Sequence, residues 1–252
     1  LRAFLININV KFYNKTLNKK FWSDQVFDTD IRKKLLAITS DFIKELELDG
    51  VKVYDVTLTG SNSNYNYNEF SDLDVHVLID YKEINEDEDL VKSALDGQRF
   101  IWNLRHNINL RDHNVEMYVQ DKDEPHVASG LYSIQDDRWI TKPSYDPPSI
   151  DRRDVYKKAN AFKKDVNILK EKLSKVKGSD AKILHDVGKK LKQKISKMRK
   201  RGLAREGEFS IENLAFKVLR NSNIIEDLID LIGQSYDKIY MENFKTFFEY
   251  YQ

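Results

Sequence analysis

The sequence predicts an α+β fold, with a sheet and flanking helices over residues 1–145 and an α-helical domain over residues 146–252. Runs rich in β-branched and other apolar residues predict strands in the first part. Apolar residues recur at helical spacing between these runs and throughout the second part. The two parts meet at Tyr145-Asp146-Pro147-Pro148-Ser149, a turn-rich stretch whose prolines prevent a helix from crossing it.

Three strands and two helices are expected in the first part. The strands are the apolar runs 51–58, 75–79 and 115–119. The first helix covers residues 30–47 and can be capped by Asp28 or Thr29. Its apolar face consists of Ile31, Leu35, Ile38, Phe42 and Leu46. The second helix, residues 87–106, links the second strand to the third, and its apolar residues are Leu90, Ala94, Leu95, Ile101 and Leu104.

A hairpin is expected over residues 129–141, with its turn at Gln135-Asp136-Asp137. Tyr132 and Trp139 are its candidate packing aromatics. Trp139 could also stack on a nucleic-acid base, but a position in the core is the favoured interpretation.

The α-helical domain is expected to contain four helices. Apolar residues repeat at alternating spacings of four and three over 155–176, which is a heptad pattern. They are Val155, Ala159, Phe162, Val166, Leu169, Leu173 and Val176. After a break at Gly178-Ser179-Asp180, a second helix would place Ile183, Val187, Leu191, Ile195 and Met198 on one face and pair with the first as an antiparallel hairpin. Two more helices are expected over 211–221, capped by Ser210, and over about 224–241.

Two short motifs beside the first two strands carry the chemistry. Gly60-Ser61 closes the first strand, and Asp72 and Asp74 open the second after a ten-residue spacer. Residues i and i+2 of a strand point the same way, so both carboxylates can face one cation. Gly60 lets the backbone approach a phosphate closely, and Ser61 offers an amide and a hydroxyl to it.

A third carboxylate comes from the third strand. Glu116 is an isolated charge between Val115 and Met117, which would face the opposite side. Three carboxylates from two strands can hold two divalent ions, the arrangement that stabilises attacking and leaving oxygens in phosphoryl transfer. Oxygen ligands suit Mg²⁺ or Mn²⁺. Asp112 and Asp121 are the alternatives to Glu116 as the third ligand.

This pattern resembles the nucleotidyltransferase superfamily related to DNA polymerase β. The family's signature is matched by Leu58, Gly60, Ser61, Asp72, Asp74 and Glu116, within roughly residues 45–120. The whole chain further resembles nucleotidyltransferase-like proteins of tailed bacteriophages. That similarity lies in WSDQVFDTDIRKKLL, TLTGSNSNYNYNEFSDLDVHV, ASGLYSIQDDRW and KMRKRGLAREGEFSIENLAFKVLR. Many relatives carry Arg or Gly in the spacer, where this chain has four Asn and two Tyr residues between 62 and 68.

The resemblance implies a mixed sheet and a metal-dependent, ATP-binding type of transferase, which moves NMP from an NTP to a hydroxyl and releases pyrophosphate. Asp72 and Asp74 would bridge two Mg²⁺ or Mn²⁺ ions, Glu116 would hold the catalytic one, and Gly60 and Ser61 would hold the terminal phosphates. The acceptor could be an RNA 3′ end or a second nucleotide, which are favoured, or a protein side chain or small molecule. A catalytically inactive fold that binds nucleic acid or serves as a phage structural or interaction module is the alternative.

The net charge of +1 hides an asymmetry between the two parts of the chain. Residues 1–150 carry 18 basic and 26 acidic residues, net −8, whereas residues 151–252 carry 24 and 15, net +9. The density of basic residues is highest in one cluster, which could bind RNA or form a solvated helix face. The cluster is Lys189, Lys190, Lys192, Lys194, Lys197, Arg199, Lys200 and Arg201. Lys157, Lys158, Lys163 or Lys164 could reach the nucleotide.

Composition excludes several other classes. The chain has no cysteine, so disulfides, zinc–thiolate sites and thiol nucleophiles are excluded. The sequence has no run of 18 apolar residues, so no transmembrane helix or membrane partner is expected, and residues 1–10 make a poor signal peptide. A cytoplasmic location is expected, in the host if the protein is phage-encoded. The histidines suggest no metal site; His76 could line the aspartate face, although a hydrogen-bonded strand histidine is the favoured interpretation.

Overall fold

A computed structural model describes residues 12–126, 128–146, 149–176 and 179–250, without the side chains of Ser179 and residues 241–250. The chain divides after residue 147 into two compact units, each described here by itself. The first unit, which ends at residue 147, contains the strands and two long helices, and the second is built from helices. The predicted α+β class is therefore confirmed at this coarse level.

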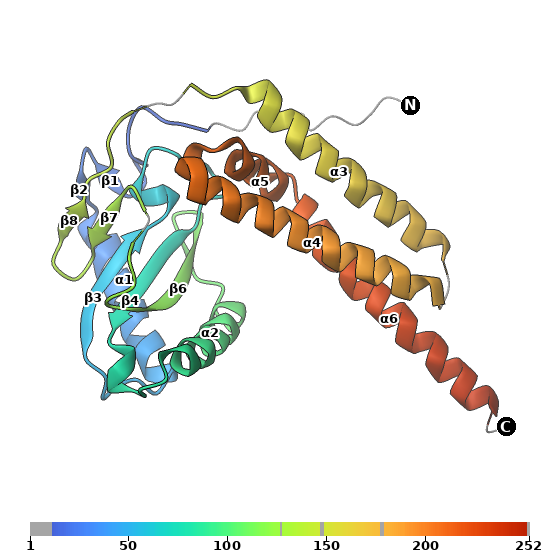
Figure 1. Cartoon of the computed structure of the whole chain (residues 1–252). Coiled ribbons are helices and arrows are strands. Elements are labelled where there is room, and N and C mark those ends of the chain that lie inside the picture. The colour runs from blue at the N-terminus through green and yellow to red at the C-terminus, as the bar shows by residue number, and fades with distance from the viewer. Residues whose placement is uncertain (1–11, 127, 147–148, 177–178, 251–252) are drawn as a thin grey trace. The chain divides into compact units, whose positions relative to one another are not determined.

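The first unit is built on a six-stranded mixed sheet in the order β5-β6-β4-β3-β7-β8 (Figure 1). The strands are β3 (Val53–Thr59), β4 (Leu73–Ile79), β5 (Asn109–Leu110), β6 (His113–Asp121), β7 (Leu131–Ser133) and β8 (Arg138–Thr141). Only the β4–β6 pair is parallel among the described strands. A parallel pair needs a crossover connection, which the helix α2 supplies between β4 and β6.

Helices α1 (Thr29–Glu45) and α2 (Glu88–Arg105) share one hydrophobic core with one face of the sheet. Phe42 of α1 and Trp102 of α2 meet with ring centroids 5.0 Å apart. Asp28 caps α1, as predicted, because its Oδ1 accepts hydrogen bonds from the amides of Asp30 and Ile31. Short 3₁₀ turns follow β3 and β4, η1 (Ser61–Ser63) and η2 (Tyr81–Glu83).

The core-facing side of α2 differs from the apolar residues singled out in the sequence. Of that set only Leu95 is buried, and it is joined in the core by Val91 and Trp102. Leu90, Ala94, Ile101 and Leu104 are exposed. The helix therefore has two apolar sides, and only its packing on β6 shows which one covers the sheet.

The predicted hairpin is confirmed as β7 and β8, and its aromatics pack. Strands β1 (Trp22–Ser23) and β2 (Val26–Phe27) form a small hairpin whose Trp22 stacks on Trp139, with centroids 4.5 Å apart. Trp139 Nε1 donates to Gln25 O at 2.9 Å, and Tyr132 is buried beside both indoles. Trp139 is thus a packing residue, as the favoured interpretation held.

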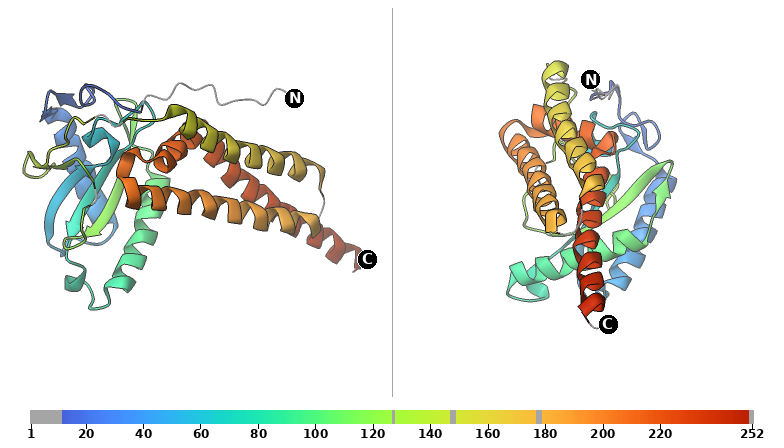
Figure 2. Two further views of the ribbon diagram at one scale, coloured as in Figure 1. Left: turned by 45° about the horizontal axis from the view of Figure 1, so that its top comes forward. Right: turned by 90° about the vertical axis from the view of Figure 1, so that its right-hand side faces the viewer.

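The second unit consists of α3 (Arg152–Lys175), α4 (Ser179–Glu206), α5 (Ile211–Asn221) and α6 (Ile224–Tyr250), with the 3₁₀ turn η3 (Gly207–Phe209) before α5. Figure 2 shows α3, α4 and α6 as long neighbouring rods. All six predicted seam residues inside α3, from Val155 to Leu173, are buried. The antiparallel hairpin of α3 and α4 is only part of the packing, because α4 packs most extensively on α6 and α3 on α5.

The apolar face predicted for α4 is wrong in its first half. Ile183 and Val187 are exposed, whereas Ala181, His185 and Gly188 are buried. A Cβ on Gly188 would lie 2.8 Å from Ile232 Cγ1, so α6 approaches α4 closely at this glycine. Small residues permit the close helix crossing, and periodicity based on large apolar side chains does not detect them.

Candidate functional site

The sheet face opposite α1 and α2 is polar where β3, β4 and β6 meet. In β4, Leu73 and Val75 are buried in the core, while Asp74 and His76 alternate with them and face the other way. In the strand register Asp74 pairs with Thr59 of β3 on one side and with Glu116 of β6 on the other. Asp72 lies directly before β4 and is half-buried, like Asp74. The structure thus brings residues from all three predicted segments to one face.

Gly60 is fitted against Asp74. Its φ of +75° and ψ of −161° belong to a region that only glycine adopts readily. An ideal Cβ on Gly60 would lie 1.9 Å from Asp74 Oδ2, so a side chain there would overlap the carboxylate. The Gly60 backbone therefore lies directly against the Asp74 carboxylate. Its approach to a phosphate stays a prediction.

The spacer after Ser61 is held by the fully buried side chain of Asn62. Asn62 Nδ2 donates to Ser71 O at 3.2 Å and to Asp72 O at 2.8 Å. Its Oδ1 accepts from Asn18 Nδ2 at 2.9 Å, and its backbone carbonyl accepts from Trp22 Nε1 at 2.7 Å. These bonds fasten the start of the spacer to its end, and so they position Asp72.

Ser71 is a second anchor of the spacer. Its Oγ accepts from Ser61 Oγ at 2.8 Å and from the Asn68 amide at 3.0 Å. Its carbonyl accepts from His113 Nδ1 at 2.5 Å, while His113 Nε2 lies 3.4 Å from Asn18 Nδ2. Asn62 and Ser71 thus hold the loop from within. Asn18 and His113 were missed because nothing in their local sequence marks them.

Glu116 is engaged by a neighbour on its own strand. Tyr118 Oη donates to Glu116 Oε2 at 2.5 Å. Burial raises the pKa of the Tyr118 phenol, and the charges of Asp74 and Glu116 raise that pKa further, so the hydroxyl stays a donor. The Tyr118 ring is fixed between His76, stacked with centroids 4.7 Å apart, and the guanidinium of Arg99, 4.5 Å from the ring centroid.

His76 is a hydrogen-bonded strand histidine on the aspartate face. Its Nδ1 lies 2.7 Å from Gln120 Oε1. Burial lowers the pKa of His76 to about 4, although the Gln120 contact acts in the opposite direction. The imidazole is therefore neutral near pH 7 and adds no positive charge beside the carboxylates.

Asp74 and Glu116 are neighbours in the sheet, and Asp72 lies directly before β4. Among the described residues, no three Asp, Glu or His side chains are arranged to hold a metal ion. The alternatives to Glu116 have other roles. Asp112 is exposed and pairs with Lys20 at 3.0 Å, and Asp121 Oδ2 accepts from the Tyr81 amide at 2.8 Å. Glu116 is thus the β6 carboxylate that lies in register with Asp74.

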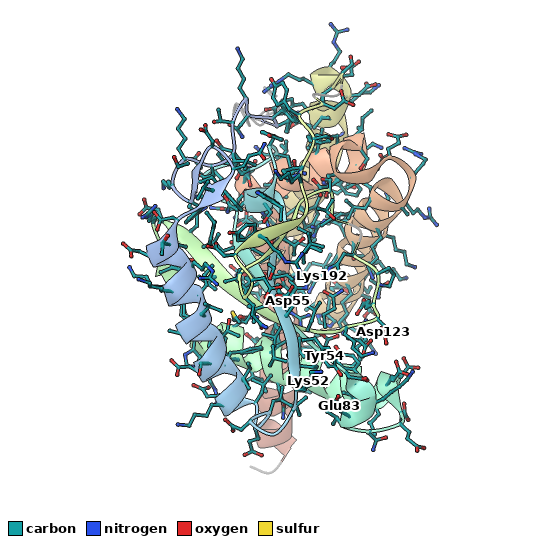
Figure 3. The ribbon with its side chains drawn as sticks, turned by 90° about the vertical axis from the view of Figure 1, so that its left-hand side faces the viewer. Lys52, Tyr54, Asp55, Glu83, Asp123 and Lys192 are labelled. Atoms are coloured by element: carbon teal, nitrogen blue, oxygen red, sulfur yellow. The ribbon has the colours of Figure 1, made fainter. Side chains whose placement is uncertain are left out.

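A buried hydroxyl continues the polar face along β3. Thr57 pairs with His76 in the register, and its Oγ1 is buried without a hydrogen-bond partner among the described residues. Farther along, Asp55 Oδ1 accepts from Ser133 Oγ at 2.7 Å, and burial raises the pKa of Asp55. Figure 3 shows Asp55 apart from Tyr54 and Glu83, whose side chains bond to each other at 2.9 Å.

The predicted cationic residues belong to the second unit. Lys157 and Lys158 lie in the first turns of α3, and Lys158 Nζ pairs with Glu212 Oε1 of α5 at 2.5 Å. The basic cluster lies on α4, where all its members except Arg199 are exposed. Arg199 is half-buried against Phe216, 4.4 Å from the ring centroid, and its Nε donates to Asn213 Oδ1.

A cavity of about 650 Å³ lies among α3, α4 and α5 in the second unit. Six basic side chains line it together with one acidic side chain, Glu212. Half of the predicted basic cluster faces this cavity, namely Lys190, Lys194, Lys197 and Arg201. Periodicity could have grouped these four residues, because they recur at i, i+4, i+7 and i+11.

In comparisons with known proteins, no family model, no curated sequence and no solved structure matches the chain. Among the described helices, none combines the length and apolarity needed to cross a membrane.

Proposed function

We propose that this protein is a metal-dependent nucleotidyltransferase of the polymerase β-like type. It would transfer NMP from an NTP to a hydroxyl group and release pyrophosphate. The observation that carries the proposal is the fit of Gly60 against Asp74, in a register that aligns Asp74 with Glu116. A Gly-Ser turn in contact with a carboxylate brings a phosphate-binding backbone and an anionic metal ligand together, as NTP chemistry requires.

The donor set suits hard divalent cations. Asp72, Asp74 and Glu116 would hold Mg²⁺ or Mn²⁺, which prefer carboxylate oxygens, and the ions would supply Lewis-acid stabilisation of negative charge. The Thr57 hydroxyl on the same face has no hydrogen-bond partner among the described residues, and it supports a site that a ligand or ordered water completes, since a buried unsatisfied hydroxyl costs roughly 1–3 kcal/mol.

The chain's own residues would act by positioning. Gly60 lets the backbone lie beside the phosphates, and Asn62 fixes the Asp72 backbone through two hydrogen bonds. The acceptor hydroxyl would attack the α-phosphorus, forming one P–O bond as the bond to the β-phosphate oxygen breaks. The hydroxyl proton would pass to solvent water, and pyrophosphate would depart with the bonding electrons. Neutral His76 adds no competing cation, and the un-ionised Tyr118 adds no further negative charge.

A second candidate function is nucleic-acid binding without catalysis. The hydrogen bond between Tyr118 and Glu116 favours it, because it engages the carboxylate needed as the third ligand. A polymerase β-like fold that binds nucleic acid or a phage assembly partner would retain the same sheet. The two candidates predict opposite results in one assay.

That assay incubates the pure protein with each labelled NTP and Mn²⁺, with and without RNA, and follows NMP incorporation and pyrophosphate. Asp74→Asn should remove incorporation, because a lost metal ligand costs several orders of magnitude and each ~1.36 kcal/mol is tenfold. Asp112→Asn is the matched control, since Asp112 is exposed, lies in the turn between β5 and β6 and pairs with Lys20, and it should retain full activity. Equal activity of Asp74→Asn and wild type would exclude catalysis at this site. No incorporation by wild type with any NTP would favour the binding-only candidate.

A further inference from the structure

The cavity among α3, α4 and α5 has an excess of positive charge. Its basic lining residues are Lys158, Lys190, Lys194, Lys197, Arg201 and Arg205. Lys158 and Arg205 both contact Glu212, at 2.5 Å and 3.2 Å. These contacts hold the pKa of Glu212 below its usual value, the Lys158 hydrogen bond being the largest cause. The only acid lining the cavity is therefore already paired.

The other four cations form a row along α4. Lys190, Lys194, Lys197 and Arg201 make no ion pair or side-chain hydrogen bond within the part of the chain that the structure describes. Like charges at spacings of three and four residues repel one another on a helix. Such a row lining a hollow is stabilised when an anion enters it.

The shape of the row indicates which anion fits. Eleven residues of helix span about 16 Å, at a rise of ~1.5 Å per residue. Each strand of a DNA duplex carries a phosphate about every 3.4 Å of axis, and an unstacked single strand spaces them more widely, so the row can contact a few consecutive phosphates. Phe162 and Met198 add apolar surface to the same cavity, and Lys194 Nζ lies 5.5 Å from the Phe162 ring centroid. Phe162 is buried beneath the row, so the single-strand feature that the cavity offers is the positively charged groove that follows a nucleic-acid backbone.

We propose that this cavity binds the backbone of single-stranded nucleic acid, and that α4 therefore has a binding side and a passive side. Lys190, Lys194, Lys197 and Arg201 form the binding side, whereas Lys189 and Lys200 are exposed outside the cavity. The role of the strand as acceptor rests on the proposed function. Binding itself does not, because it needs neither NTP nor metal.

The test compares two double variants of equal charge on one helix. A fluorescent single-stranded RNA of about 12 nucleotides, within the ~4–16 typical of such sites, is titrated with full-length protein at several salt concentrations. Lys194→Gln/Lys197→Gln should weaken binding about tenfold or more at low salt. It should also lower the salt slope by about 1.4, since each phosphate contact contributes ~0.7 on single strands. Lys189→Gln/Lys200→Gln should change both quantities little.

The two double variants distinguish a binding site in the cavity from a general attraction to α4. Equal losses of RNA affinity in the two variants would show that the positive charge of α4 attracts RNA without a specific site, and would overturn the proposal. Absence of RNA binding by wild type would overturn it as well. Displacement of the RNA by NTP alone, with the same loss in Lys194→Gln/Lys197→Gln, would assign the cavity to a nucleotide instead. Asp74→Asn should bind RNA like wild type, so failure of catalysis and failure of this site are distinguishable.

A second, independent observation concerns the outward side of α2. Leu90, Ala94, Gly97, Ile101 and Leu104 recur at spacings of four, three, four and three, which is a heptad seam. The large members are exposed, Leu90 by 58%, Ile101 by 47% and Leu104 by 74%. At the centre, a Cβ on Gly97 would meet nothing within 4 Å. The seam is therefore exposed, and Gly97 at its centre leaves room for another helix to approach closely.

One pair of opposite charges on α2 lies symmetrically about Gly97. Asp89 lies eight residues before it and Arg105 eight after, and Leu90 and Leu104 lie seven on either side. Neither Asp89 nor Arg105 forms an ion pair with another described residue. If two copies of α2 cross antiparallel at Gly97, each Asp89 faces the other copy's Arg105 and each Leu90 faces Leu104. This is the self-complementarity that a two-fold interface requires.

The geometry points to a weak homodimer formed through α2. Sedimentation of wild type should show concentration-dependent dimers at micromolar protein, equivalent to about −8 kcal/mol. Asp89→Arg and Arg105→Asp should each give monomers, and the double variant Asp89→Arg/Arg105→Asp should restore the dimer. Ile101→Asp should give monomers, whereas Ile229→Asp, at an equally exposed site on α6, should not. A wild-type protein that stays monomeric at about 100 µM, well above that Kd, would overturn the proposal. So would a result in which Ile229→Asp gives monomers and Ile101→Asp does not.

Discussion

Gly60 leaves room for Asp74: an ideal Cβ on the glycine would lie 1.9 Å from Asp74 Oδ2. The contact joins the turn after β3 to the first carboxylate of β4, its neighbour in the sheet. Any other residue at position 60 would have to adopt a φ of +75° and displace the carboxylate. A substitution at position 60 is therefore expected to change both the backbone conformation and the position of the Asp74 carboxylate.

Gly60→Ala should impair the site more than it impairs the fold. The left-handed conformation and the overlap with Asp74 should destabilise the protein by roughly 1–3 kcal/mol, and NMP transfer should fall further because Asp74 is displaced. Thermal unfolding and single-turnover kinetics measure the two effects. Gly50→Ala is the control, since a Cβ there meets nothing within 4 Å. Wild-type activity in Gly60→Ala would contradict the role given to this contact.

Asn62→Ala should destabilise the first unit by roughly 1–3 kcal/mol, because buried hydrogen-bond partners are left unsatisfied. Its side chain joins Ser71 O, Asp72 O and Asn18 Nδ2. Asn114→Ala, at an exposed position in β6, should change the unfolding free energy little. Urea denaturation of both variants measures the difference, and equal midpoints would show that the spacer network does not stabilise the fold.

Tyr118→Phe should release Glu116 while retaining the ring stack with His76 and the contact with Arg99. If Glu116 serves as the third ligand, Mn²⁺ binding should tighten about tenfold, equivalent to ~1.4 kcal/mol, because the carboxylate no longer has to leave a hydrogen bond. Calorimetric titration with Mn²⁺ measures this directly. Weaker Mn²⁺ binding in Tyr118→Phe would show instead that the hydroxyl orients Glu116.

Asp28 should contribute to stability in a pH-dependent way. The Ile31 amide is the largest cause that lowers the pKa of Asp28 below 3.8, and Arg111, with Nη2 2.7 Å from Asp28 Oδ2, lowers it further. A lowered folded-state pKa stabilises the protein above the unfolded value, and this contribution is lost as the pH falls through the folded value. Asp28→Ala should cost about 1 kcal/mol at pH 7 through the lost cap.

Asp28→Asn separates capping from ionisation, because asparagine caps helices about as well as aspartate. This variant should keep most of the stability at pH 7 and lose the Asp28 contribution to acid unfolding. Urea midpoints measured from pH 7 down to pH 3 give both quantities. An acid profile of Asp28→Asn identical to that of wild type would show that ionisation of Asp28 is not linked to folding.

Much of the first unit follows from local sequence. The predicted 30–47 helix is observed at 29–45 and the 87–106 helix at 88–105, because caps and helical periodicity are local properties. The predicted strand 115–119 extends over 113–121, and the fourth helix of the second unit runs to Tyr250 rather than ending near 241. Element ends depend on partners, such as the β5 residues that pair with His113 and Asn114.

The sequence by itself determined that Asp74 alternates with core residues of β4, that a glycine precedes Ser61 and that Glu116 is an isolated charge in its strand, because strand alternation and glycine conformation act over a few residues. Only the tertiary structure placed Asp74 between Thr59 and Glu116, engaged Glu116 with Tyr118, and recruited Asn18 and His113 to hold the spacer. The tertiary structure also determined which side of α2 and of α4 is buried. Both helices carry apolar residues on more than one side, and the side that packs is decided by the shape of the neighbouring element, which no local pattern contains.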